Sequence, residues 1–199
     1  LEKEAPDDPA LLRVLALAYS QTGQVARAIE VLERALETHT DYAYYFHGLL
    51  ASNYLRGGNA ERARYHTEQA IELSPTQSGR HVQLGTLLVR EGQQSEALAA
   101  FDSALSSGVR DPHNVLFAAG LIERELNRWG EALARFEKAV AIEPGFALAH
   151  VQVALCSAEL GQFAEARAAL DRAARNGARE DAVRSARSRL IELEAAAVE

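Results

Sequence analysis

The sequence has no methionine and a single cysteine among its 199 residues. One cysteine cannot form a disulfide within the chain. Cys156 lies in the apolar run VQVALCSAEL, which is typical of a buried thiol, whereas a catalytic thiol needs a base and an electropositive setting. A chain that starts at Leu1 and lacks methionine is expected to be a piece of a longer protein. Both the cytoplasm and the periplasm stay open as its compartment.

The sequence also lacks long apolar runs and a surplus of positive charge. No stretch reaches the roughly 20 apolar residues of a transmembrane helix, so no membrane insertion is expected. The net charge of −7 argues against nucleic acid as a partner, because phosphate binding draws on clustered Lys and Arg. No nucleotide-binding, zinc-protease, serine-hydrolase or calcium-loop motif is present. The sequence therefore predicts a protein that is not an enzyme and that needs no cofactor.

What the sequence does contain is an internal repeat of 34 to 35 residues. Four columns stay in register through five copies. The first is Ala28, Ala63, Ala97, Ala132 and Ala166; seven residues later come Ala35, Ala70, Ala104, Ala139 and Ala173. Five residues before the first column stand Gly23, Gly58, Gly92, Asn127 and Gly161, and four after it Leu32, Thr67, Phe101, Phe136 and Leu170.

Each column has a physical reason. Apolar residues four, seven and eight positions after Ala132 form one stripe of a helix. The glycine column predicts a left-handed residue that ends an earlier helix, and Asn127 is a side chain that tolerates this conformation. Pro75 and Pro144 should stop the second helix, while Asp8 and Asp111 precede prolines as N-caps do. Each copy therefore reads as helix, tight turn, helix and loop.

The copies resemble the tetratricopeptide repeat family. Its motif of Trp, Leu, Gly, Tyr, Ala, Phe, Ala and Pro is matched in the second copy by His47, Leu50, Ala51, Tyr54, Ala63, Thr67, Ala70 and Pro75. The third and fourth copies supply His81, Leu84, Gly85, Leu88, Ala97, Phe101 and Ala104, then Leu116, Ala119, Gly120, Ala132, Phe136, Ala139 and Pro144. The first and fifth supply Leu12, Leu15, Ala16 and Tyr19, then His150, Val153 and Ala154. Departures are Glu123 and Ser157 in the Tyr slot and Thr67 in the Phe slot.

The resemblance implies an all-α fold, a right-handed solenoid of antiparallel helix pairs. The predicted boundaries are residues 1–8 as a lead-in, then repeats at 9–42, 44–77, 78–111, 113–146 and 147–180, and a capping helix at 181–199. His47, His81 and His150 share one slot a full repeat apart, which indicates packing and no metal site.

The family's first helices line a concave groove, which the resemblance implies is the binding site. The residues expected to line it are Arg13, Leu17, Tyr45, Leu49, Ser52, Arg56, Val82, Gln83, Thr86, Arg90, Asn114, Phe117, Leu121, Leu148, Val151, Gln152 and Glu159. Arg56 and Arg90 occupy equivalent places and are candidates to pair with acidic groups, with a solvated row as the alternative. The groove has no Lys and one Asn, which argues against the subclass that grips a chaperone's terminal carboxylate.

The function expected from these residues is a non-catalytic scaffold that binds a peptide or protein segment in the groove. Two alternatives stay open. In the first, the chain is an accessory domain of a larger enzyme, such as a glycosyltransferase or sulfotransferase. In the second, it is an assembly or homo-oligomerisation module of a bacterial envelope or secretion complex. The aromatic run Tyr42 to Phe46 is interpreted mainly as packing, with one ring as a candidate exposed anchor.

Overall fold

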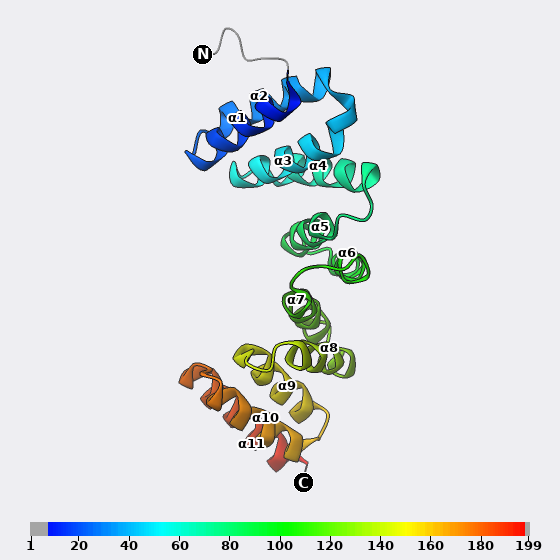
Figure 1. Cartoon of the computed structure of the whole chain (residues 1–199). Coiled ribbons are helices and arrows are strands. Elements are labelled where there is room, and N and C mark those ends of the chain that lie inside the picture. The colour runs from blue at the N-terminus through cyan, green and yellow to red at the C-terminus, as the bar shows by residue number, and fades with distance from the viewer. Residues whose placement is uncertain (1–7, 198–199) are drawn as a thin grey trace. The chain divides into compact units, whose positions relative to one another are not determined.

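Within residues 8–197, which the computed structural model describes, every regular element is a helix (Figure 1). The chain divides into two compact units, Leu1–Ser107 and Gly108–Glu199. Unit 1 holds α1 (Pro9–Gln21), α2 (Val25–Thr38), the short 3-10 helix η2 (Thr40–Tyr42), α3 (Ala43–Arg56), α4 (Ala60–Leu73), α5 (Ser78–Arg90) and α6 (Gln94–Ser106). Unit 2 holds α7 (Pro112–Glu125), α8 (Trp129–Ile142), α9 (Ala147–Glu159), α10 (Phe163–Arg175) and α11 (Glu180–Ala196). The predicted all-α class is confirmed.

Helices pack mainly against the next helix along the chain. The pairs are α1 with α2, α3 with α4 and α5 with α6 in unit 1, and α7 with α8 and α9 with α10 in unit 2. We call the earlier member of each pair its first helix and the later member its second helix. The last helix, α11, packs against both α9 and α10, and so covers the end of the stack in unit 2.

The tight turn inside each pair depends on one left-handed residue. Gly23, Gly58, Gly92 and Gly161 have φ angles of 74° to 81°, and Asn127 has φ 57°. Asn127 is the one non-glycine with positive φ among the described residues. The residue after each of them donates back across the turn, as Arg128 N–H does to the Glu123 carbonyl at 2.8 Å. The left-handed turn predicted from this column is confirmed.

The helix ends follow the proline positions. Pro9 and Pro112 are the first residues of α1 and α7, and α4 and α8 end two residues before Pro75 and Pro144. The side chain of Asp8 accepts a hydrogen bond from Ala10 N–H at 2.8 Å, as predicted for an N-cap. Asp111 holds the equivalent place before α7, but its side chain makes no cap hydrogen bond.

Size complementarity brings the two helices of each pair close together. A Cβ atom added to Gly85 would lie 2.7 Å from the Phe101 ring, and one added to Gly120 would lie 2.8 Å from the Phe136 ring. In the other three pairs alanine stands at the glycine position, and a residue smaller than phenylalanine stands at the phenylalanine position. These combinations are Ala16 with Leu32, Ala51 with Thr67 and Ala154 with Leu170, all buried. A large ring in the second helix is thus matched by the absence of a side chain in the first.

Thr67 shows how the polar residue in this slot is accommodated. Its side chain is fully buried, and its hydroxyl donates to the Ala63 carbonyl one turn earlier at 2.7 Å. A buried hydroxyl without such a partner would be costly. The departure from phenylalanine is therefore satisfied within its own helix.

Gly120→Ala tests this complementarity. The added methyl group would press on the Phe136 ring, so we expect the free energy of unfolding of unit 2 to fall by about 1–3 kcal/mol, although alanine favours helices over glycine. Urea unfolding followed by the fluorescence of Trp129, the only tryptophan, reports on unit 2.

Gly130→Ala is the matched control, because a Cβ there meets nothing within 4 Å and should raise stability by up to about 1 kcal/mol. Adding Phe136→Leu to Gly120→Ala should restore part of the loss. Equal effects of the two alanine substitutions would contradict the size match.

Candidate partner-binding site

None of the predicted groove residues of unit 1 is fully buried, although Leu49 packs against the core. We call the surface that they form on α1, α3 and α5 the first-helix face of unit 1. Leu17, Tyr45, Ser52, Arg56, Thr86 and Arg90 are exposed, and Arg13, Leu49, Val82 and Gln83 are half-buried. Apolar, amide, hydroxyl and guanidinium groups are therefore available to a partner on these three helices.

Arg13 and Tyr45 join the first two helices of this face. The guanidinium of Arg13 donates to the Tyr45 hydroxyl at 3.3 Å, and its central carbon lies 5.4 Å from the centre of the Tyr45 ring. Such a cation over an aromatic face gains electrostatic energy and fixes a long, flexible side chain. The contact spans α1 and α3.

Arg80 of α5 joins this helix to α3. The sequence did not predict it as a site residue. Its Nη1 donates to the Gly48 carbonyl and to Gln83 Oε1, both at 3.0 Å. A Cβ at Gly48 would lie 2.5 Å from the Arg80 guanidinium, so the glycine is what lets this side chain lie across α3. Burial lowers the pKa of Arg80, and the neighbouring Tyr45 opposes that shift. The one feature of the sequence that could have indicated this contact is Gly48, a glycine inside a helix and away from any turn.

Arg56 and Arg90 hold equivalent places but differ in their contacts. Nη1 of Arg56 donates to the Ser20 carbonyl at 2.5 Å and to the Ser20 hydroxyl at 2.9 Å, so Arg56 ties α3 to the end of α1. Arg90 is exposed at the end of α5, and its side chain makes no hydrogen bond or ion pair within the described part of the chain. Of this predicted pair, Arg90 is therefore the one with a free guanidinium.

The aromatic run contributes to both core and surface. Phe46 is 1% exposed and packs in the core of unit 1. Tyr42, Tyr44 and Tyr45 are 52%, 37% and 38% exposed, so three of the four rings are exposed where one was expected. Tyr44 and Tyr45 meet edge to face with ring centres 5.5 Å apart. Of the three tyrosines, Tyr45 is the one that contacts Arg13.

In unit 2 the predicted residues are less accessible. Asn114 and Leu148 are exposed, but Phe117 and Leu121 pack against the core. Val151 is 4% exposed, which corrects its assignment to the groove, because its side chain belongs to the core of unit 2.

Two polar groove residues of unit 2, Gln152 and Glu159, already have partners. Arg124 donates to Gln152 across α7 and α9. Glu159 accepts from Arg189 of α11 at 2.9 Å, so the capping helix neutralises it. These contacts leave unit 2 with fewer free charged groups than the first-helix face of unit 1.

The three histidines in the Trp slot act in packing. His81 and His150 each place Nε2 against a proline carbonyl of the preceding loop, Pro75 at 2.7 Å and Pro144 at 2.9 Å. His47 instead faces His66, with their Nδ1 atoms 2.8 Å apart. Over residues 8–197 no group of three or more His, Cys, Asp or Glu side chains converges as a metal site would require.

Two buried reactive side chains also have structural surroundings. Burial raises the pKa of Cys156 to about 11, which keeps it as the unreactive thiol at neutral pH. Glu123, in the motif's Tyr slot, is buried and accepts from Nε of Arg135 on α8 at 2.9 Å. The pair links α7 to α8 and leaves the other carboxylate oxygen, Glu123 Oε2, buried without a hydrogen-bond partner among the described residues.

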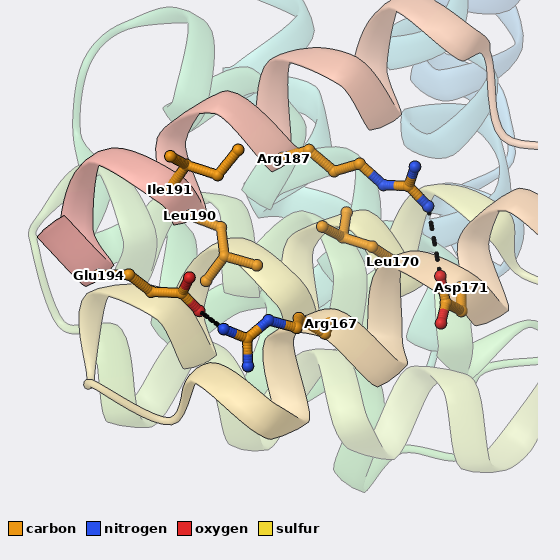
Figure 2. Close-up of a pocket in the computed structure, with 7 residues that line it drawn as sticks. All are labelled: Arg167, Leu170, Asp171, Arg187, Leu190, Ile191 and Glu194. Atoms are coloured by element: carbon orange, nitrogen blue, oxygen red, sulfur yellow. Dashed lines mark hydrogen bonds and ion pairs between the residues drawn. The ribbon is translucent and has the colours of Figure 1, made fainter.

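A hollow of about 270 Å³ lies between α10 and α11 (Figure 2). Leu170, Leu190 and Ile191 make it apolar. Ion pairs of Arg187 with Asp171, at 3.3 Å, and of Arg167 with Glu194 flank these side chains. Its residues come from the capping helix and the second helix beneath it, so it lies apart from the predicted groove. No helix in the described range is both long enough and apolar enough to cross a bilayer.

The sequence pattern of the tetratricopeptide repeat family matches residues 1–52 and 116–190, and a second pattern of the same family matches residues 82–145. The chain belongs to the tetratricopeptide repeat family. The resemblance inferred from the repeat columns is thereby confirmed.

Two curated relatives match this repeat protein. Protein IFIT1 homolog B of Homo sapiens is 27% identical over 161 residues, which are 81% of the chain and 31% of the relative. The tetratricopeptide repeat and J domain-containing co-chaperone DNJ1 of Fusarium oxysporum f. sp. lycopersici is 32% identical over 107 residues, which are 50% of the chain and 20% of the relative. The chain thus spans less than a third of either relative.

Solved structures share the fold. YrrB, a TPR protein with an unusual peptide-binding site, superposes with a TM-score of 0.79 at 21% identity, covering 94% of this chain and 95% of YrrB. MamA gives 0.74 at 19% identity, covering 81% of this chain and 93% of MamA. PilF of Pseudomonas aeruginosa gives 0.73 at 19% identity, covering 93% and 83%. The predicted solenoid fold of helix pairs is confirmed.

The His47–His66 pair predicts a loss of stability in acid. Burial lowers the pKa of both histidines, that of His66 to about 4, and the charge of Arg62 and the closeness of His47 act on His66 in the same direction while Glu33 opposes them. In the unfolded chain both histidines take up a proton near pH 6.5, whereas His66 in the folded chain does so only near pH 4. Stability is therefore lost as the pH falls through this window, by about 1–2 kcal/mol between pH 7 and pH 5.

Urea unfolding followed by circular dichroism at several pH values measures this loss. His66→Gln keeps a hydrogen-bonding side chain that does not titrate, so its pH dependence should be flatter. His113→Gln in unit 2 is the control and should retain the dependence of the parent. A parent-like slope in His66→Gln would show that the acid sensitivity arises elsewhere.

Proposed function

We propose that this repeat protein is a non-catalytic interaction scaffold that binds a peptide or protein segment on the first-helix face of unit 1. The observation that carries the proposal is the difference between the two helices of each pair. The alanine columns of the second helices are buried in packing. The side chains on the first-helix face remain exposed or half-buried, and the contacts of Arg80 and Arg56 hold that face in shape without a ligand.

The composition of this face suits a polypeptide. Gln83 and Ser52 offer groups that can pair with a main chain, while Leu17, Leu49 and Val82 offer apolar contacts. An extended peptide needs this mixture, because its backbone seeks hydrogen bonds and its alternate side chains seek apolar surface. A preformed face also spares the ligand the cost of ordering the protein.

Similar proteins support a role in binding other proteins. YrrB has a peptide-binding site and DNJ1 is a co-chaperone, as their names state. This chain covers a fifth of DNJ1, so the other domains of that relative contribute nothing to the proposal.

Selection of peptides from a displayed random library, followed by fluorescence anisotropy with the selected sequences, tests this function. Thr86→Trp places a large side chain on the exposed surface of α5 and should weaken binding by about tenfold or more through steric exclusion.

Thr38→Trp on α2 is the matched control. Like Thr86, Thr38 is an exposed threonine whose hydroxyl donates to the carbonyl four residues earlier. It should bind as the parent does. Failure of the library to yield any binder, or equal loss in both variants, would refute binding on the first-helix face.

A further inference from the structure

Charge is divided between the two kinds of helix in unit 1. The chain carries 28 acidic residues against 21 basic ones, yet α1, α3 and α5 contain no Asp or Glu. Their only charged residues are Arg13, Arg56, Arg80 and Arg90. Each second helix of the unit, by contrast, contains acidic residues. The first helices of unit 2 carry Glu123, Glu125 and Glu159, so the division is particular to unit 1.

The arginines of this face come from all three first helices. Arg13 of α1 lies against Tyr45 of α3, and Arg80 of α5 donates to the Gly48 carbonyl of α3 and to Gln83. Two guanidinium groups, one from α1 and one from α5, are thus held against α3. Arg90 extends the positive charge to the far end of α5.

Among the described residues, 8–197, none of these three arginines is paired with a carboxylate. The partners of Arg13 and Arg80 are a hydroxyl, a carbonyl and an amide oxygen, all uncharged, and Arg90 has none in the described residues. The nearest acids along the chain lie at helix ends: Asp8 caps α1, Asp41 lies in η2, and Glu91 after α5 pairs with Arg64 at 2.6 Å. Arg80 has therefore lost water through burial without gaining a counter-charge, a cost that a ligand's carboxylate would offset.

We propose that the first-helix face of unit 1 recognises an acidic segment within a partner protein, with side-chain carboxylates placed against Arg13 of α1 and Arg80 of α5. Guanidinium groups bind carboxylates with two parallel hydrogen bonds, and both are already held in position here. The apolar side chains Leu17 and Leu49 would contact residues between the acidic ones. This proposal rests on the proposed function and adds the chemistry of the partner.

Binding of fluorescent peptides to the full chain tests it. One peptide alternates Glu with Leu, with both ends blocked; a second has Gln at every Glu, and a third has the first sequence with a free C-terminal carboxylate. The blocked acidic peptide should bind at least about tenfold more tightly than the Gln peptide, and its affinity should fall as salt is raised. Equal binding of the Glu and Gln peptides would overturn the inference, as would binding only of the peptide with the free terminus.

Arg13→Gln and Arg80→Gln should each lower the affinity for the blocked acidic peptide by about tenfold. Both variants should retain the helical circular dichroism of the parent. Arg34→Gln on α2 removes the same charge from an exposed site on a second helix and should leave the affinity unchanged. Because Arg80→Gln can disturb its contact with Gly48, Arg13→Gln provides an independent measure. Equal weakening in Arg34→Gln would show a general charge effect and refute the site.

Two further outcomes separate this inference from the proposed function. If Thr86→Trp abolishes binding of the Gln peptide while charge has no effect, the face binds peptides but does not select acidic ones. A short single-stranded RNA that displaces the acidic peptide and binds more tightly would replace the proposed partner with nucleic acid. Weaker or absent RNA binding supports the acidic peptide.

Discussion

The structure depends on how closely the two helices of each pair can approach. Where the second helix carries Phe101 or Phe136, the first carries glycine at the facing position; where it carries leucine or threonine, the first carries alanine. The glycine–phenylalanine and alanine–leucine combinations fill a similar total volume, whereas Ala51 with Thr67 fills less. Close-packed interiors tolerate such compensation far better than a change on one side alone.

Most of the fold was predictable from the sequence, because the repeat restates the same constraints five times. The left-handed residue at Asn127 and the proline stops after α4 and α8 were inferred from chemistry that acts within a few residues. Asp111 was the exception at a helix end: its position matched an N-cap, but the side chain forms no cap bond. A side-chain rotamer is set by neighbours that a local pattern does not contain.

The candidate site was less predictable, since its residues depend on contacts between pairs. Arg80 was missed because it lies across Gly48, a residue 32 positions earlier. Val151 was placed in the groove by its repeat position, although its side chain lies in the core of unit 2. Arg56 and Arg90 are equivalent in sequence, yet only Arg56 is held by Ser20. Repeat position specifies which way a side chain leaves its helix, and the neighbouring pair determines whether it is free.

The separation of charge between first and second helices has a consequence for the approach of a partner. The first helices of unit 1 carry arginines and no acidic residue, whereas its second helices carry eight acidic residues and four arginines, so the unit has an electric dipole transverse to its helices. A negatively charged molecule diffusing nearby is turned toward the arginine side before it touches the protein, and is repelled from the opposite side. Such steering raises the rate of association and leaves the lifetime of the complex to the short-range contacts. In this way a protein with a net negative charge can still attract a negatively charged partner to one of its surfaces.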